Sequence, residues 1–483
     1  MIKRQQTYRR ILGKVRTLYE ISERLMGSPE EADGFGDAGC PGNAGGFGNA
    51  DSRENADGCE KLTSLYVMAP VMCMYVAWVL REARAAGTKR LYFLARDGYS
   101  MYETARVFCE KKGISIECRY LYCSRYAWRG AEYHLLGEES LSYICLGGID
   151  VNFRKLMFRA GLTDREGKEI AALTGMAEDY EKPLTYRRLK ELRTLLAACK
   201  PFMDKMTRKS RHAYPLVTGY LRQEGLLEPV PWALVDSGWT GSMQKSLQHL
   251  LDSAGYEGKA EGYYFGMYEY PRGMNPDTYH CWYFSPADGL RRKAYFSNSL
   301  FECIFSSPEG MTTGYEKRDG LYCPVLEKRW NPNREKIIAA TGYLKRYAEG
   351  LSERAGEGTD PSDFPVQKQK KIASALLKNF MGRPSPEEAR EFGSYVFCDD
   401  VIGEGDQKAA AELTPEQIRE NWLLYKTAGY LKKNGSRVRE SAWLEGSMMG
   451  AGMDAAGLWH CALSRYALYL RKRMRDLLKH ING

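Results

Sequence analysis

A short apolar run, a turn and apolar residues at helical spacing follow one another twice in this chain. The first apolar run, at 90–95, leads through the turn 96–98 into a helical pattern that ends at Lys112-Gly113, and another apolar run follows at 116–123. Apolar runs of this length joined by one helix predict a β-α-β unit. Strands connected in this way lie parallel, so the pattern predicts a parallel sheet.

The second occurrence begins with the apolar run 232–235, which is followed by the turn 236–241, a helical pattern and a further apolar run at 262–265. Between the two units, residues 138–225 carry mainly helical patterns, and we expect them to form a helical insertion that covers the mouth of the sheet. The predicted fold class is α/β: a parallel Rossmann-like sheet built from two β-α-β units, with a helical insertion and a helical C-terminal region.

The same patterns divide the chain into segments. Residues 1–26 predict a basic N-terminal helix. Residues 27–60 are rich in Gly, Asn and Asp without apolar periodicity, which predicts a disordered linker. Residues 61–325 hold the predicted α/β core. In 330–483 the strand patterns vanish and helix-start patterns remain, so we expect a helical C-terminal domain.

Composition narrows the class of protein. The chain has 483 residues, a formal net charge of +9 and 13 cysteines. The charge excess is mild for this length, and we expect no specific nucleic-acid partner. An odd number of scattered cysteines, without metal-ligand spacing, indicates free thiols in a reducing compartment and therefore a cytoplasmic protein.

Two features leave contact with a membrane open. The uncharged run 62–80 is barely long enough to span a bilayer, and a buried helix is the preferred interpretation. The basic stretches 1–26 and 465–483 could act as amphipathic helices on an anionic surface, although a basic helix on an acidic protein partner has the same pattern.

The turn 236–241, which follows the first strand of the second predicted unit, has the composition of a phosphate site. Ligands of open parallel sheets bind beyond the carboxyl ends of the strands. Glycines allow a close approach of the backbone, hydroxyls donate hydrogen bonds, and the following helix presents free N–H groups. Asp236 is placed to hold a metal ion or a ligand hydroxyl. The alternative is an ordinary tight turn with Ser242 as a helix cap. The predicted phosphate-binding residues here are Ser237, Gly238, Thr240, Gly241 and Ser242.

The turn after the first predicted strand carries charged residues. Asp97 could act as a base or as a metal ligand, and Arg96 could bind phosphate through two hydrogen bonds. Structurally, Asp97-Gly98 alone would also make the turn. Ser124 and Arg125 follow the run 116–123 at the equivalent edge of the sheet and could face the same crevice.

A fourth segment, 301–315, contains Glu302 and a loop rich in Gly and hydroxyl residues. Such a loop could complete an anion site, or it could be a surface loop. Together with Arg96, Gly98, Ser124 and Arg125, we include Glu302 among the predicted substrate-binding residues.

These four segments carry a family resemblance. The stretches LYFLARDGY (91–99), YLYCSR (120–125), VDSGWTGSMQ (235–244) and FECIFSSPEGMTTGY (301–315) resemble a region of bacterial predicted hydrolases of the haloacid dehalogenase superfamily. The resemblance covers roughly residues 62–320. It implies an association with glycosyltransferases and with the synthesis of cell-surface polysaccharides.

The chain departs from that superfamily at the reacting residues. Its hydrolases use a nucleophilic Asp within an Asp-x-Asp motif, whereas Ala95 occupies the nucleophile's place here and Asp236-Ser237-Gly238 lacks the second carboxylate. Aspartyl-phosphate chemistry needs both groups, so we expect that phosphatase activity to be absent. The segment WALVDSGWTGS (232–242) also resembles, more faintly, the diphosphate-sugar loop of type I phosphoribosyltransferases. That loop has two acidic residues, whereas this segment has one and is one position shorter.

The sequence therefore predicts an enzyme that acts on a phosphorylated sugar or nucleotide-sugar in polysaccharide metabolism. Asp97 and Asp236 are the predicted catalytic residues, either as bases or as ligands of a divalent ion such as Mg²⁺. The alternatives are a phosphoribosyltransferase-like transferase, a non-catalytic ligand- or protein-binding partner of glycosyltransferases, and a membrane-associated scaffold.

Overall fold

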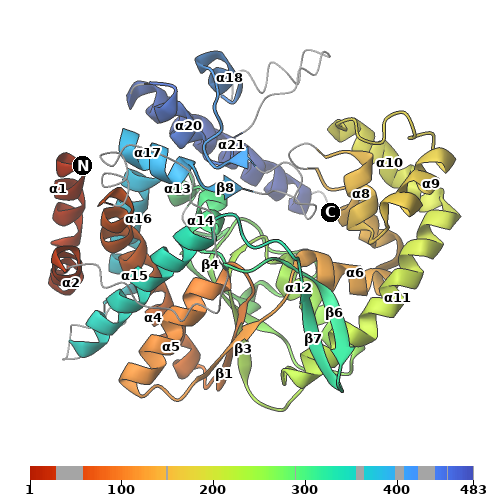
Figure 1. Cartoon of the computed structure of the whole chain (residues 1–483), viewed down its shortest axis with the longest axis horizontal. Coiled ribbons are helices and arrows are strands. Elements are labelled where there is room, and N and C mark those ends of the chain that lie inside the picture. Colours follow the sequence, from red (N-terminus) through yellow and green to blue (C-terminus); the bar gives the residue numbers. More distant parts are fainter. Residues whose placement is uncertain are drawn as a thin grey trace, which may run out of the picture.

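The computed structural model describes residues 1–28, 58–147, 151–288, 290–354, 364–397, 407–422, 441–453 and 455–481. Most of the segment predicted to be a disordered linker, 27–60, lies outside the described residues. The described chain is a mixed α/β protein whose sheet forms the centre of the molecule (Figure 1).

The central sheet has five parallel strands in the order β2-β1-β3-β4-β5. This confirms the predicted parallel sheet. Four of its strands coincide with the predicted apolar runs, and β5 was not predicted. The strands are β1 (Arg90–Leu94), β2 (Glu117–Leu121), β3 (Trp232–Trp239), β4 (Glu261–Met267) and β5 (Tyr279–Phe284).

Apolar residues on both faces of the strands explain why the sheet is buried. Leu91 and Phe93 of β1 pack into one hydrophobic core, whereas the intervening Tyr92 and Leu94 pack into a second core on the opposite face. Alternation of side chains along a strand produces this division. Parallel sheets are stable when helices cover both faces.

Helices from different parts of the chain supply the two cores. The first face is covered by α4 (Ala69–Ala85), α5 (Gly98–Lys112), α15 (Arg334–Glu353) and α16 (Val366–Phe380). The second face is covered by α6 (Arg125–Leu136), α11 (Lys200–Gln223) and α12 (Ser242–Ser253). The antiparallel hairpin β6 (Thr312–Arg318) and β7 (Leu321–Leu326) packs against α11.

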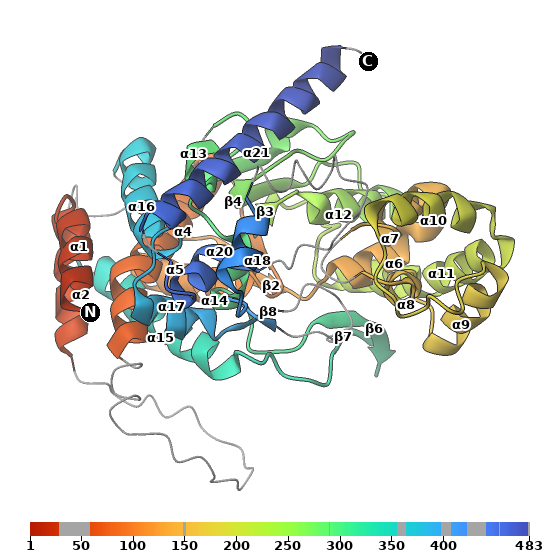
Figure 2. The same ribbon diagram turned by 90° about the horizontal axis from the view of Figure 1, so that it is seen from above.

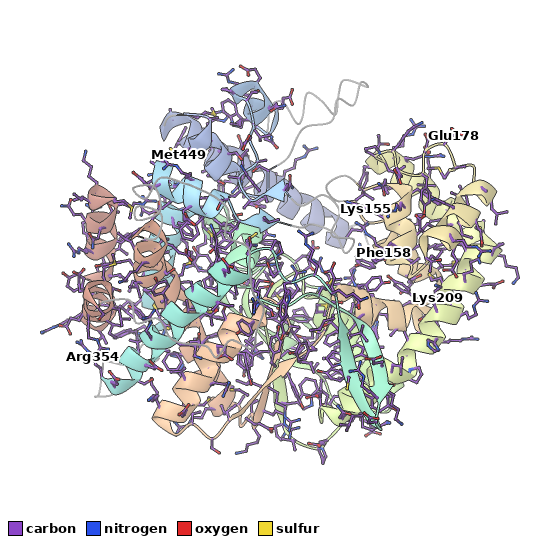
Figure 3. The ribbon with its side chains drawn as sticks, in the orientation of Figure 1. Lys155, Phe158, Glu178, Lys209, Arg354 and Met449 are labelled. Carbon is purple, nitrogen blue, oxygen red and sulfur yellow. The ribbon has the colours of Figure 1, made fainter. Side chains whose placement is uncertain are left out.

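The chain between β2 and β3 is helical in its described part, and its outer helices form a lobe with a hydrophobic core of its own. Phe158 of α8 (Phe153–Arg159), labelled in Figure 3, stacks on Tyr126 of α6 with the ring centroids 5.2 Å apart. The lobe and the N-terminal helices lie at opposite ends of the molecule (Figures 1 and 2). The lobe contains η2 (Gly137–Ser140), α7 (Leu141–Ile144), α8 (Phe153–Arg159), α9 (Asp164–Leu173) and α10 (Tyr186–Ala198).

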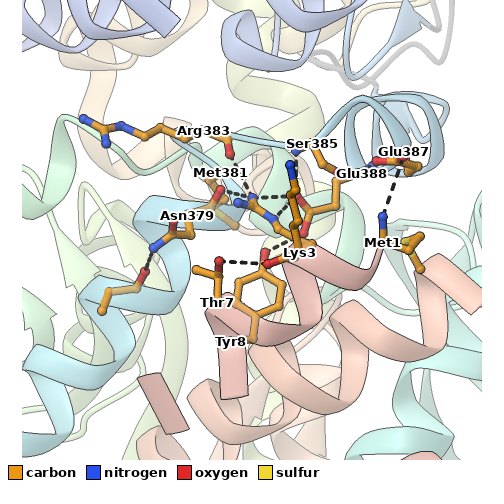
Figure 4. A network of polar contacts seen from close by, with 12 residues as sticks. Met1, Lys3, Thr7, Tyr8, Asn379, Met381, Arg383, Ser385, Glu387 and Glu388 are labelled. Atoms are coloured by element: carbon orange, nitrogen blue, oxygen red, sulfur yellow. Dashed lines mark hydrogen bonds and ion pairs between the residues drawn. The ribbon is translucent and has the colours of Figure 1, made fainter. Parts of the chain in front are cut away.

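The N-terminal segment forms two helices instead of the single predicted helix: α1 (Ile2–Leu12) and α2 (Arg16–Gly27). The chain turns at 13–15, which allows Leu12 and Leu18 to be fully buried in the same core. Arg4 of α1 pairs with Glu388 at 2.6 Å (Figure 4). This contact holds the beginning of the chain against α17 (Pro386–Gly393).

The described C-terminal third is mainly helical, as predicted, but it also contains the two short paired strands β8 (Val396–Phe397) and β9 (Gln407–Lys408). Two-residue strands carry no alternation that a sequence pattern could reveal. Arg465 forms an ion pair of 2.7 Å with the buried carboxylate of Glu445. The remaining elements are η1 (Ser64–Met68), η3 (Pro276–Thr278), α13 (Leu290–Lys293), α14 (Asn298–Ile304), α18 (Pro415–Glu420), α20 (Leu444–Gly450) and α21 (Ala455–Ile481).

Within the described residues, one helix, Gly58–Ala85, is long and apolar enough to cross a membrane. Its apolar stretch is entirely buried inside the protein, as in the core helix of a globular domain. This agrees with the interpretation of 62–80 as a buried helix.

Candidate functional site

The carboxyl ends of β1 and β3 lie side by side in the sheet. The two strands pair in parallel up to Phe93 and Val235. From β1 the chain proceeds to β2 on one side, and from β3 it proceeds to β4 on the other side. Connections that leave adjacent strands in opposite directions open a crevice at the edge of a parallel sheet. At this edge the hydroxyl of Ser237 donates a hydrogen bond to the carboxylate of Asp97. The two predicted turns are therefore in direct contact.

The structure corrects the position of the second turn. Instead of ending at Val235, β3 continues to Trp239 and pairs Gly238 with Gly266 of β4. Polar residues and a glycine are typical of a turn, but here β4 continues beside them and supplies backbone partners. Gly238 has φ +102°, and a Cβ atom there would lie 2.8 Å from the carbonyl oxygen of Gly266. The turn itself is Thr240-Gly241, and Gly241 has φ +62°.

Glu302 reaches the same edge from α14. The indole N–H of Trp239 donates to Oε1 of Glu302 over 2.6 Å. Trp239 has φ +59°, a strained backbone conformation for a bulky side chain. Its ring packs against Phe301, with centroids 5.6 Å apart. The structure therefore gathers three carboxyl groups from distant parts of the sequence, those of Asp97, Asp236 and Glu302.

The environment makes these carboxyl groups unusually weak acids. Burial raises the pKa of Asp236 to about 8, and the negative charge of Asp97 adds to this increase. Burial and the charge of Asp97 also raise the pKa of Glu302 to about 7, against the opposing charges of Arg125 and Arg96. Burial raises the pKa of Asp97, whereas its hydrogen bond from Ser237 lowers it. Carboxyl groups with pKa values near neutrality can both donate and accept protons.

Arg96 and Gly98 complete the first turn. Arg96 has φ +71°, and its backbone N–H donates to the hydroxyl of Tyr120 over 2.9 Å. Such a conformation in a residue other than glycine is uncommon and often accompanies a functional turn. Gly98 begins α5, and a Cβ atom there would lie 3.0 Å from the backbone of Phe93. Gly98 therefore permits close packing of the helix on its strand.

Ser124 serves as a helix cap. Its hydroxyl oxygen accepts the backbone N–H of Ala127 over 3.0 Å and donates to the carbonyl of Thr312 over 2.6 Å. These bonds fix the start of α6 and the start of β6. Arg125, the next residue, is exposed, and its charge acts on Asp97 and Glu302.

The predicted phosphate turn opens into a different space. Thr240 and Ser242 line a cavity of about 1340 Å³, which we call the α6–α12 cavity. The hydroxyl of Thr240 lies 3.3 Å from that of Ser242, at the first turn of α12. Neither Asp97, Asp236 nor Glu302 is among the residues that line this cavity. The sequence placed the phosphate-binding residues and the carboxylates in one site, whereas in the structure Thr240 and Ser242 line this cavity and Ser237 contacts Asp97.

The α6–α12 cavity also holds polar residues that the sequence did not indicate. Glu132 is buried, and its carboxylate accepts a hydrogen bond of 2.6 Å from Ser246. Its second oxygen lies 3.1 Å from Nδ1 of His249. Glu132 lies on α6 and the other two on α12, so only helix packing brings them together. The one available signal was the helical spacing of Ser242, Ser246 and His249 along a single face of α12.

A divalent cation would find few protein ligands here. No group of three or more His, Cys, Asp or Glu side chains is arranged to hold a metal ion within the described ranges. Asp97 and Asp236 could supply two carboxylates, which suits Mg²⁺ when substrate phosphate provides further oxygens. Their raised pKa values oppose the charged form that such a site requires.

Comparisons of the sequence with protein-family models and with curated proteins found no match. The resemblances drawn from the sequence motifs therefore stay predictions.

Proposed function

We propose that this protein is an enzyme that binds a phosphorylated sugar or nucleotide-sugar and transfers protons through Asp97, Asp236 and Glu302. The observation that carries this proposal is the convergence of the three carboxyl groups at the end of β1 and β3, with the pKa of Asp236 raised to about 8 and that of Glu302 to about 7. A buried group held at an unusual pKa has a cost in stability, and such groups concentrate at active sites.

The fold supports the proposed place of the site. The connections β1-α5-β2 and β3-α12-β4 join parallel neighbours, which agrees with a Rossmann-like sheet of two β-α-β units. In folds of this kind the ligand lies where the strand order reverses, here between β1 and β3. Asp97 and Ser237 are in contact at that position.

The phosphate group of the ligand would lie at the first turn of α12. The N–H groups of that turn have no partner within the helix and attract anions. Thr240 and Ser242 add hydroxyl donors, and both line the α6–α12 cavity. The rest of the ligand would extend from this cavity toward the carboxyl groups, where proton transfer occurs. A role in surface-polysaccharide metabolism, beside glycosyltransferases, rests on the motif resemblance.

A binding screen followed by a turnover assay tests this function. Purified protein is heated with sugar phosphates, nucleotide-sugars or phosphoribosyl diphosphate, with and without Mg²⁺, because a ligand that binds the folded state raises the melting temperature. Each ligand that raises it is then incubated with the protein, and its conversion is followed by mass spectrometry. We expect Asp97→Asn and Asp236→Asn to keep the shift and to lose conversion.

Asp204→Asn is the matched control, since this carboxylate is exposed on α11 and, among the described residues, pairs with Lys200 alone, at 2.5 Å. It should keep both binding and conversion. A shift without conversion in the native protein would favour a non-catalytic binding partner. The absence of any shift would contradict the phosphate site.

A further inference from the structure

Residues of two neighbouring helices line the α6–α12 cavity. Residues spaced by three, four and seven positions share one face of a helix. On α6 the residues that line the cavity follow this spacing, and the same holds for α12. They are Arg129, Glu132, Tyr133 and Leu136 on α6, and Ser242, Lys245, Ser246 and His249 on α12.

Arg129 is the unusual member of this lining. Its guanidinium lies 3.7 Å from the ring centroid of Tyr143, and in the described part of the chain it makes no hydrogen bond or ion pair. The carboxylate nearest along the helix face, Glu132, is occupied by Ser246 and His249. Burial lowers the pKa of Arg129. A charged side chain is thus held in the cavity wall without a counter-ion among the described residues.

A partly buried charge without a partner opposes folding, because the protein interior solvates it less well than water does. An incoming anion would remove that cost. Arginine also matches the geometry of phosphate, to which it donates two parallel hydrogen bonds. The guanidinium lies over the ring of Tyr143, and this contact restricts its position.

We propose that Arg129 is a second anion anchor in this cavity and that the ligand therefore carries two phosphate groups, as a diphosphate ester does. One phosphate binds at the first turn of α12 beside Thr240 and Ser242, and the other binds Arg129 on α6. Lys245, one turn further along α12, also lines this cavity. This inference rests on the proposed function for the first anchor and adds the class of the substrate.

Titration calorimetry with inorganic phosphate and inorganic diphosphate tests the second anchor. We expect the native protein to bind diphosphate more tightly than phosphate. In Arg129→Gln the diphosphate affinity should fall about tenfold to a hundredfold, the range for loss of a charge-assisted hydrogen-bond pair. Its phosphate affinity should change by less than about twofold, because the α12 turn is intact.

Two further variants control the experiment. Arg187→Gln removes an exposed arginine of α10 and should bind both ions as the native protein does. Arg129→Lys keeps the charge without the planar pair of donors, so its diphosphate affinity should lie between those of the native protein and Arg129→Gln. The melting temperature of each unliganded variant shows that it is folded.

Undiminished diphosphate binding by folded Arg129→Gln would overturn the second anchor and leave the proposed function in place. An equal loss of phosphate and diphosphate binding would also overturn it, since Arg129 would then act on the first site. If the native protein binds neither ion, the proposed phosphate site fails, and the second anchor fails with it.

Discussion

The carboxyl groups of Glu388 and Asp236 have neighbours of opposite charge in the folded protein. Glu388 is 1% exposed, and it pairs with Arg4 at 2.6 Å, accepts the hydroxyl of Tyr8 and accepts the backbone N–H of Ser385 over 2.8 Å (Figure 4). Asp236 accepts two backbone N–H groups and faces the negative charge of Asp97. Glu388 therefore has a cation as its neighbour, whereas Asp236 has another carboxyl group.

This difference distinguishes a carboxylate that stabilises the fold from a carboxyl group that is suited to proton transfer. A buried carboxylate with a cation and several donors joins the segments that supply those partners. Glu388 in this way joins α1 to α17. A buried carboxyl beside another carboxyl holds its proton up to a higher pH, which suits proton transfer. The predictions below test the contrast through the free energy of unfolding.

The largest loss is expected when Glu388 is replaced by Ala. Arg4 and Tyr8 would then keep buried polar groups without their partner, and the first turn of α17 would lose a capping contact. Removal of one member of a buried ion pair costs about 3–5 kcal/mol. Urea unfolding measures the change. The neighbouring Glu387→Ala, whose side chain is 40% exposed, is the control and should cost less than about 1 kcal/mol. Equal losses in the two variants would show that the contacts of Glu388 stabilise the fold no more than those of the exposed Glu387.

A second effect is a dependence of stability on pH. The folded-state pKa values of about 8 for Asp236 and about 7 for Glu302 lie above those of exposed carboxyl groups, which are about 4. The folded protein therefore binds these protons more tightly than the unfolded chain does. Their contribution to stability is complete below about pH 4 and is lost as the pH rises through 7 and 8. Unfolding curves between pH 4 and 9 should show the decline, and Asp236→Asn with Glu302→Gln should flatten it. An unchanged slope would contradict the raised pKa values.

Replacement of Ser124 by Ala should cost about 1 kcal/mol, the typical value of a lost helix cap. The missing hydroxyl also leaves the Thr312 carbonyl without its donor. Ligand-induced shifts of the melting temperature should persist, because the hydroxyl of Ser124 is committed to the backbone of α6 and β6. Loss of those shifts with little loss of stability would restore Ser124 to the ligand site.

The smallest change in stability is expected for Asp236→Asn near pH 4, where the carboxyl of the unfolded chain is also becoming protonated. With a pKa of about 8 the native carboxyl is already neutral there, and the amide oxygen can accept the same backbone N–H groups. The free energy of unfolding should change by less than about 1 kcal/mol, as is usual when no partner is left unpaired. Conversion of substrate, measured on the same preparation, should be abolished. A loss comparable to that of Glu388→Ala would make Asp236 a structural residue.

The candidate site was only partly predictable. The turns after 90–95 and 232–235 were located because apolar runs that end in polar residues are a local pattern. The extension of β3 to Trp239 was missed, since its cause is pairing with β4, a segment more than twenty positions away. Arg129 was missed as well, because its significance depends on the partners that the nearby Glu132 finds on α12.

The sequence by itself determined four of the five strands of the central sheet, the main helices and the existence of a parallel sheet, because apolar spacing is set by the geometry of each element alone. It also identified Asp97 and Asp236 as candidate residues of the site, although β3 continues beyond Asp236. Only the tertiary structure decided that Glu302 joins them, that Ser124 is a cap and that Arg129 faces a cavity. Burial and neighbouring charges are properties of packed segments. They determine the pKa of a carboxyl group and the need of a guanidinium for a counter-ion, and neither is encoded in the residues adjacent along the chain.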